Sequence, residues 1–173
     1  MKKNNPSKVF LKKSKIHGQG IYAKEFIKKG EKVIEYIGEK VTKKEGERRA
    51  ERQMELSKGN PSQGAVYIFE LNKKFDIDGS PEYNLAKYIN HSCSPNCEIY
   101  IRKDHIWIKS KKRIKKGEEI LYNYGYDLED YKDHPCKCKS KNCMGFILDQ
   151  KLWKKFKKMN KKMGLDITVY MVA

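Results

Sequence analysis

The chain of 173 residues and 20.4 kDa has the length of one domain and can bury a sizeable core. Its 39 Lys and Arg residues outnumber 22 Asp and Glu residues, for a net charge of +17, and 11% aromatic residues is too many for a disordered polymer. No apolar run reaches membrane-spanning length, and the basic first residues lack the apolar core of a secretory signal. We therefore expect an intracellular protein, such as a cytoplasmic one, with no membrane partner.

Short strands separated by glycine turns are predicted over the first 41 residues. They cover Lys8–Lys12, Ile21–Phe26 and Glu31–Val41, with turns at Gly18–Gly20 and Gly30. A helix is predicted from Thr42 to about Ser57, because Thr42 and Glu45 match a capping box before a segment rich in helix formers. Its apolar residues are few, so it should be mostly exposed.

Two hairpins, a further strand and a second helix are predicted in the rest of the chain. The hairpins join Gly64–Leu71 to Lys74–Ile77 and Ile99–Arg102 to His105–Lys109, and Glu119–Tyr124 is the further strand. Lys151–Met163 has the pattern of a basic amphipathic helix with Leu152, Phe156 and Met159 on one face. These elements predict a mostly β protein with few helices, and by themselves they do not identify the fold.

Two segments are dense in groups that can bind a ligand. Asn90 and His91 directly follow an apolar step and offer donors and acceptors, although a capped turn with a satisfied histidine is the plainer alternative. Tyr122, Tyr124 and Tyr126 share one face if their segment is extended, which would make a wall of rings with three hydroxyls. A half-buried aromatic strand face is the alternative there.

The five cysteines favour a metal site over disulfides, because a chain without an export signal is expected in a reducing compartment. Cys136, Cys138 and Cys143 are close enough in sequence to hold one tetrahedral Zn²⁺, and either Cys93 or Cys97 is available as the fourth ligand. The excess positive charge favours acidic partners, including non-specific nucleic acid contact, although scattered lysines can also serve solubility alone.

Together these motifs resemble the SET-domain protein lysine methyltransferases, from about Lys8 to about Ile147. The matching segments, in the family's order, are His17-Gly-Gln-Gly20, Glu35-Tyr36-Ile-Gly38-Glu39, Tyr67-Ile-Phe-Glu-Leu71, Asp76-Ile-Asp78, Asn90-His91-Ser92-Cys93-x-Pro95-Asn96-Cys97, Glu118-Glu119-Ile-Leu-Tyr122-Asn-Tyr124 and Cys136-x-Cys138-x4-Cys143. The resemblance implies the SET-domain fold, small β-sheets around a pseudoknot through which the Asn-His-Ser segment passes. It implies a tail at 1–7, a SET domain at 8–127, a post-SET zinc segment at 128–148 and a C-terminal helix and tail at 149–173.

The resemblance also implies the roles of individual residues. Residues that would hold S-adenosylmethionine are His17, Gly18, Gln19, Gly20, Tyr67, Asn90 and His91, with Phe146 a candidate lid on the adenine. Tyr124 matches the active-site tyrosine, Tyr36 a hydroxyl beside the reacting nitrogen, and Tyr122 the phenylalanine/tyrosine switch. The zinc ligands would be Cys93, Cys136, Cys138 and Cys143, which leaves Cys97 as a small buried residue.

The implied function is a protein-lysine N-methyltransferase that acts on a basic protein, histone-like or otherwise chromatin-associated. A tyrosine at the switch position implies mainly monomethylation with some dimethylation. The alternative is a non-catalytic, zinc-stapled module that binds basic peptides or nucleic acid. Retention of Tyr36, Tyr122 and Tyr124 together with Asn90 and His91 argues against it.

Overall fold

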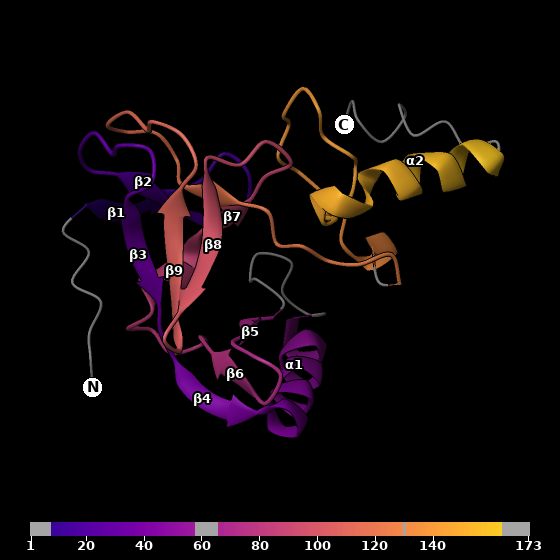
Figure 1. Cartoon of the computed structure of the whole chain (residues 1–173), viewed down its shortest axis with the longest axis horizontal. Coiled ribbons are helices and arrows are strands. Elements are labelled where there is room, and N and C mark those ends of the chain that lie inside the picture. The colour runs from indigo at the N-terminus through magenta and orange to yellow at the C-terminus, as the bar shows by residue number, and fades with distance from the viewer. Residues whose placement is uncertain (1–7, 58–65, 130, 164–173) are drawn as a thin grey trace.

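The structure, a computed structural model, describes residues 8–57, 66–129 and 131–163 (Figure 1). The expected tails at 1–7 and 164–173 and the first two residues of the predicted strand Gly64–Leu71 lie outside the described residues. The strands are β1 (Val9–Lys13), β2 (Gln19–Ala23), β3 (Lys32–Tyr36), β4 (Glu39–Thr42), β5 (Ile68–Glu70), β6 (Phe75–Asp78), β7 (Asn90–His91), β8 (Cys97–Arg102), β9 (His105–Ser110) and β10 (Leu121–Tyr122). The α-helices are α1 (Lys43–Ser57) and α2 (Trp153–Lys162), and short 3₁₀ helices occur at Leu85–Tyr88, Tyr131–Asp133 and Gln150–Leu152. The described chain is therefore mostly β, as expected.

An antiparallel sheet in the order β3-β9-β8 contributes buried residues from each of its strands to the larger core. The predicted hairpin of β8 and β9 is confirmed, and its turn residues Lys103 and Asp104 both have positive φ, 50° and 60°. Two positive φ values are typical of the tight hairpin turn whose twist matches that of the flanking strands. Ile106 and Ile108 of β9 point inward and are essentially inaccessible to solvent.

The segment predicted as one strand from Glu31 to Val41 is wrong as a single element, because it divides at Gly38 between two sheets. β3 pairs with β9, whereas β4 pairs with β6 in a second sheet of order β4-β6-β5. A Cβ atom at Gly38 would lie 2.0 Å from the carbonyl oxygen of Asp78. Only glycine therefore lets the chain pass this closely to β6 as it changes sheets.

Helix α1 covers the second sheet and is mostly exposed, as predicted (Figure 1). The hydroxyl oxygen of Thr42 accepts a hydrogen bond from the Glu45 backbone N–H at 3.3 Å, which is half of the predicted capping box. The Glu45 carboxylate does not complete it, since it pairs instead with Arg48 and Arg49. Gly46 is the buried residue of the helix, and a Cβ there would lie 2.4 Å from Asp76 Oδ2.

The strand predicted at Glu119–Tyr124 is shorter than expected. Only Leu121–Tyr122 forms β10, which pairs in parallel with β7, with Leu121 opposite Asn90 and Tyr122 opposite His91. The next residue able to extend the ladder, Tyr124, gives its backbone N–H to the His91 Nδ1 atom at 3.1 Å. The ladder of β10 with β7 therefore ends at Tyr122, because the Tyr124 N–H donates to a side chain and not to a backbone carbonyl of β7.

Two hydrophobic clusters stabilise the described chain. The larger one contains the buried residues of the sheets. The smaller one joins Cys93 to the segment after Tyr131 and to the predicted C-terminal helix, which the structure confirms as α2 with Phe156 fully buried. Within the described residues, no helix has the length and apolar character needed to span a membrane.

Candidate active site

A cavity of about 610 Å³ opens between the second sheet, β7, β10 and the loop before β2. Its lining has a polar end and an aromatic end. The polar end is formed by Lys13, His17, Gly18, Gln19, Lys87, Tyr88 and Asn90, and the aromatic end by Tyr36, Tyr67, Phe69, Tyr122, Tyr124 and Tyr126 together with Val66, Ile68 and Glu70. Sites for small ligands usually combine such apolar walls with a few polar groups.

At the polar end, Asn90 fixes the loop that precedes β2. Its Nδ2 atom lies 3.2 Å from the His17 carbonyl oxygen and 2.9 Å from the Gln19 carbonyl oxygen. Gly18, between them, has a φ of +46°, a conformation that glycine adopts at little cost. The structure thus brings His17, Gly18, Gln19 and Asn90 to one end of the cavity, and it places Gly20 within β2 outside the lining.

Glu119 is a residue of this site that the sequence analysis did not single out as functional. Its carboxylate accepts hydrogen bonds from the Ser14 hydroxyl at 2.7 Å, the Tyr22 hydroxyl at 3.1 Å and Asn90 Nδ2 at 3.0 Å. A Cβ at Gly20 would lie 2.4 Å from Glu119 Oε1, so the glycine makes room for the carboxylate. In the sequence Glu119 follows Glu118 in a Lys-rich turn, and nothing distinguishes it there from a solvated charge.

The aromatic end is a chain of ring contacts from β3 to the segment after β10. Tyr36 and Phe69 have ring centroids 5.2 Å apart, Phe69 and Tyr122 6.3 Å, Tyr122 and Tyr124 4.9 Å, and Tyr124 and Tyr126 6.3 Å. A Cβ at Gly79 would lie 2.3 Å from the Tyr36 hydroxyl, so this ring needs a glycine beside it. Side chains far apart in sequence thus enclose one narrow space.

Of the hydroxyls of Tyr36, Tyr122 and Tyr124, two are held by backbone carbonyls. The Tyr36 hydroxyl donates to the Tyr67 carbonyl oxygen and the Tyr124 hydroxyl to the Ile89 carbonyl oxygen, each at 2.8 Å. Within the described residues, the Tyr122 hydroxyl has no such hydrogen bond. Burial raises the pKa of all three phenols well above the ordinary value, so they stay protonated near neutral pH and keep oxygen lone pairs available as acceptors.

His91 lies behind the cavity and does not line it. Its ring meets Tyr124 edge-on, with centroids 5.4 Å apart, and its Nδ1 atom accepts the Tyr124 backbone N–H. Burial lowers the pKa of His91 to about 4, so the ring is neutral and its Nδ1 lone pair is available for this bond. The structure therefore gives His91 a contact to the tyrosine segment.

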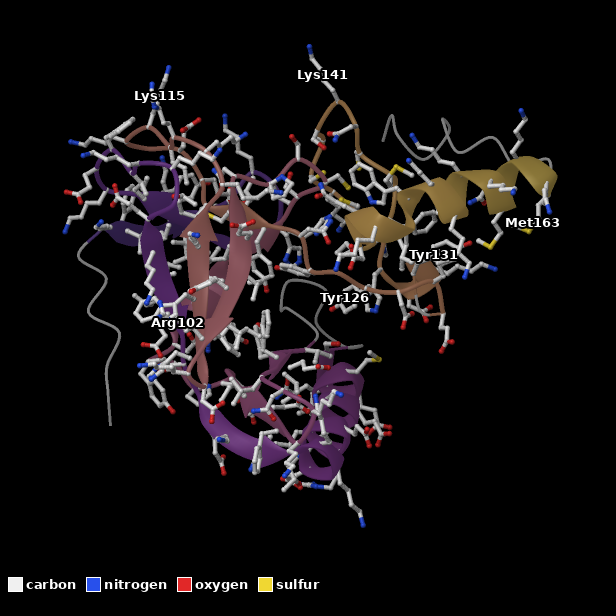
Figure 2. All side chains as sticks on the ribbon, in the orientation of Figure 1. Arg102, Lys115, Tyr126, Tyr131, Lys141 and Met163 are labelled. Atoms are coloured by element: carbon white, nitrogen blue, oxygen red, sulfur yellow. The ribbon has the colours of Figure 1, made fainter. Side chains whose placement is uncertain are left out.

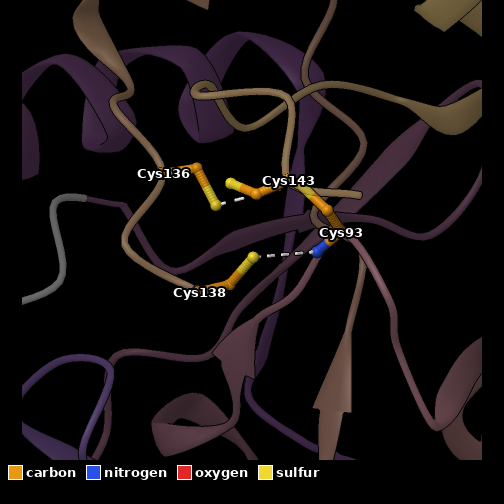
Figure 3. Close-up of side chains that lie close together, drawn as sticks. All are labelled: Cys93, Cys136, Cys138 and Cys143. Carbon is orange, nitrogen blue, oxygen red and sulfur yellow. Dashed lines mark hydrogen bonds between the residues drawn. The ribbon is translucent and has the colours of Figure 1, made fainter. Parts of the chain in front are cut away.

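Four cysteine sulfur atoms converge in one cluster (Figure 3). The Sγ atoms of Cys93, Cys136, Cys138 and Cys143 all lie within 4.8 Å of one another, and those of Cys93 and Cys136 are 3.8 Å apart. A tetrahedral zinc with Zn–S distances of about 2.3 Å requires sulfur atoms about 3.8 Å apart. Cys97 lies outside the cluster in β8, and burial raises its thiol pKa to about 12.

Backbone groups also fit a thiolate cluster. The Cys93 N–H donates to the Cys138 sulfur and the Gly145 N–H to the Cys143 sulfur, each at 3.4 Å. Such donors stabilise negative charge on sulfur. The cysteine set therefore fits a closed, structural metal site.

The segment that carries the cysteines reaches the cavity through one stacked pair. The ring of His134 lies on that of Tyr126 at 4.0 Å and 16°, and Tyr126 lines the aromatic end. Phe146 packs against Tyr131 and Phe156 in the smaller core and is not among the residues that line the cavity.

Comparison with known proteins agrees with this geometry. The model of the SET domain matches residues 18–125. Histone-lysine N-methyltransferase 2D of Homo sapiens is 39% identical over 146 residues, covering 82% of this chain and 2% of the relative. Histone-lysine N-methyltransferase trr of Drosophila melanogaster is 38% identical over 148 residues, covering 83% and 6%, and histone-lysine N-methyltransferase set1 of Dictyostelium discoideum is 37% identical over 145 residues, covering 82% and 9%.

The chain thus spans between 2% and 9% of the length of these relatives. The family match itself covers more than half of the chain and includes Tyr36, Asn90 and Tyr124. From this match, and from the polar loop, tyrosine wall and cysteine cluster, the chain belongs to the SET-domain family.

Proposed function

We propose that the chain transfers a methyl group from S-adenosylmethionine to the side-chain amine of a lysine in a basic protein. The observation that carries the proposal is a single cavity that joins a polar end around Asn90 to three protonated tyrosine hydroxyls. The direct test is incubation of the protein with core histones and radiolabelled cofactor. Absence of both incorporation and calorimetric cofactor binding would contradict it.

The polar end suits the cofactor. Its amide and backbone groups match a nucleoside and an amino-acid moiety, and Gly18 lets the backbone approach a ligand closely. We assign cofactor contacts to His17, Gly18, Gln19 and Asn90, with Tyr67 at the boundary of the two ends. The cofactor supplies an electrophilic methyl group on a sulfonium. Gly20 and His91 support the site from outside the lining, whereas the contact of Phe146 with adenine stays a prediction.

The tyrosines suit the incoming amine. Free lysine has a pKa of about 10.4, and an apolar channel beside a cation disfavours its ammonium form. Because the hydroxyls of Tyr36 and Tyr124 are protonated and donate to carbonyls, their remaining lone pairs can accept from the amine and aim its own lone pair. We therefore assign proton removal to water and orientation to the tyrosines. Positioning of this kind supplies much of the rate enhancement of a displacement reaction.

The cysteines would hold one Zn²⁺ that orders the segment after Tyr131. Four sulfur ligands make a closed site, which gives the metal a structural role. Because His134 stacks on Tyr126, ordering this segment would also hold the Tyr126 ring in place at the cavity wall.

Histones or other chromatin-associated proteins are the proposed substrates, and chromatin the proposed location. The support comes from relatives whose names are histone-lysine N-methyltransferase. We further propose mainly monomethylation with some dimethylation, since the Tyr122 hydroxyl is available to the amine or to a water molecule.

Replacing Tyr124 with Phe should lower turnover at least about 10²-fold, the usual cost of losing a positioned hydroxyl at the reacting atoms. Calorimetric cofactor affinity should change much less. Tyr100→Phe, on β8 and outside the cavity lining, is the control and should keep normal turnover. Equal turnover in the two variants would show that Tyr124 does not orient the amine.

Replacing Tyr122 with Phe should raise dimethyl and trimethyl products without abolishing the first methylation. Loss of the hydroxyl leaves room for a methylated nitrogen to turn, at a cost of roughly 1 kcal/mol per hydrogen bond. Intact-mass time courses of a substrate peptide with excess cofactor measure this. Efficient trimethylation by the unaltered protein would mean that another residue sets the limit.

Replacing Glu119 with Gln should weaken cofactor binding about tenfold, because the carboxylate accepts from three donors and charged acceptors make stronger hydrogen bonds. Turnover at saturating cofactor should fall much less. Glu118→Gln, at the exposed neighbouring position, is the matched control. If both variants bind the cofactor like the unaltered protein, Glu119 does not position Asn90.

The protein should contain one zinc ion per chain, and Cys138→Ser should lose both metal and activity while the larger core stays folded. Cys97→Ser should keep the metal. Elemental analysis measures the metal content, turnover measures the activity and circular dichroism measures whether the core stays folded. Active protein without metal would refute the zinc assignment, and metal loss in Cys97→Ser would show that the fourth ligand is wrong.

A further inference from the structure

Helix α2 separates its residues completely by charge. Its lysines are Lys154, Lys155, Lys157, Lys158, Lys161 and Lys162, and all six are exposed. At 3.6 residues per turn they cover an arc of about 160°, here called the lysine face. The opposite side carries Phe156 and Asn160, which are buried, and Trp153 and Met159, which are partly buried. No acidic residue stands between positions 150 and 163.

The lysine face has no anionic partner within the described part of the chain. No ion pair there involves a lysine of α2. Two arginines of α1 behave differently, since Arg48 pairs with Glu45 and Arg49 pairs with Glu39 and Asp78 at 2.7 to 2.8 Å. The two helices therefore use positive charge in different ways, one for internal ion pairs and the other for a surface open to an external anion.

The arrangement carries a cost that an external anion would offset. Lys154 and Lys158, Lys157 and Lys161, and Lys158 and Lys162 are each four residues apart, and like charges at this spacing destabilise a helix. Lysines in the first turn also oppose the helix dipole. A lysine-rich face that served solubility alone would gain from interspersed acidic residues, and α2 has none.

We propose that the lysine face of α2 binds the phosphate backbone of duplex DNA. The helix is about 15 Å long, and duplex DNA carries one negative charge per about 1.7 Å of axis, so about nine phosphate charges lie within its length. Lys141, at the tip of the neighbouring cysteine segment, adds a further exposed cation on this side of the molecule (Figure 2).

Two other polyanions fit less well. A basic amphipathic helix binds a membrane by inserting its apolar face, but Phe156 is fully buried against Tyr131 and Phe146 and cannot insert. Single-stranded nucleic acid is bound through aromatic rings on which bases stack, and the lysine face contains no aromatic residue. The backbone of a duplex needs only the charges that the face provides.

The test compares two variants of the whole protein that lose the same charge. One carries Lys154→Gln, Lys157→Gln, Lys158→Gln and Lys161→Gln on α2. The control carries Lys111→Gln, Lys112→Gln, Lys115→Gln and Lys116→Gln, which are exposed and lie at the end of the molecule away from α2, where Lys115 is seen in Figure 2. Binding of a fluorescent DNA duplex is followed by anisotropy over a range of salt concentrations, and melting temperatures check folding.

The α2 variant should bind DNA at least about tenfold more weakly, and its slope of log affinity against log salt should be shallower by about three to four, since each phosphate contact contributes about 0.9. The control should keep most of its affinity, and the α2 variant should melt no lower than the unaltered protein. Equal losses in both variants would overturn the proposal, because net charge alone would then explain binding. Unchanged binding in the α2 variant would overturn it, as would tighter α2-dependent binding to anionic vesicles or to a single strand than to the duplex.

Discussion

The parallel pairing of β7 with β10 is the contact on which the site depends. Two residues of each strand align, and each residue of β7 sends its side chain to a different component. Asn90 reaches the loop before β2, and His91 accepts the Tyr124 backbone N–H. Two positions further on, Cys93 contributes the first sulfur of the cysteine cluster. A short ladder thus positions the polar end of the cavity, its tyrosine end and the cysteine cluster relative to one another.

The second sheet holds the other wall of the cavity through α1. The Gln53 side chain accepts the Tyr67 backbone N–H at 2.8 Å, and the Tyr67 carbonyl accepts the Tyr36 hydroxyl. Gln53 also donates to the buried carboxylate of Asp78, to which Arg49 donates at 2.8 Å. Although burial alone would raise the pKa of Asp78, hydrogen bonds from Arg49 and Ser80 lower it and keep the carboxylate charged. Helix α1 is therefore connected to the Tyr36 hydroxyl through the Gln53 side chain and the backbone of Tyr67.

The positive charges of the two helices have different surroundings. On α1, Arg49 pairs with Glu39 and Asp78 and fastens the helix to its sheet. On α2, apolar residues alone attach the helix to the smaller core, so its lysines stay available at the surface. The lysines are scattered along the sequence and contribute to a net charge of +17, yet the cations of the two helices differ in whether they form ion pairs within the described residues.

The sequence by itself determined the elements whose signals are local. Turn residues located the two hairpins, helix formers after Thr42 located α1, and the spacing of Phe156 and Met159 located α2. Motif order was specific enough to identify the family, because the glycine loop, Asn-His pair, tyrosine run and cysteines occur together. Each of these depends on neighbours within a few residues, which a linear pattern records.

Only the tertiary structure decided what depends on distant contacts. The break at Gly38 arises from a close approach to Asp78, and the role of Glu119 arises from donors at Ser14 and Asn90, so neither leaves a local trace. Phe146 is apolar and near the cysteines in sequence, which does not show whether it packs in the cavity or in the smaller core. In the structure it packs in the smaller core, against Tyr131 and against Phe156 of α2.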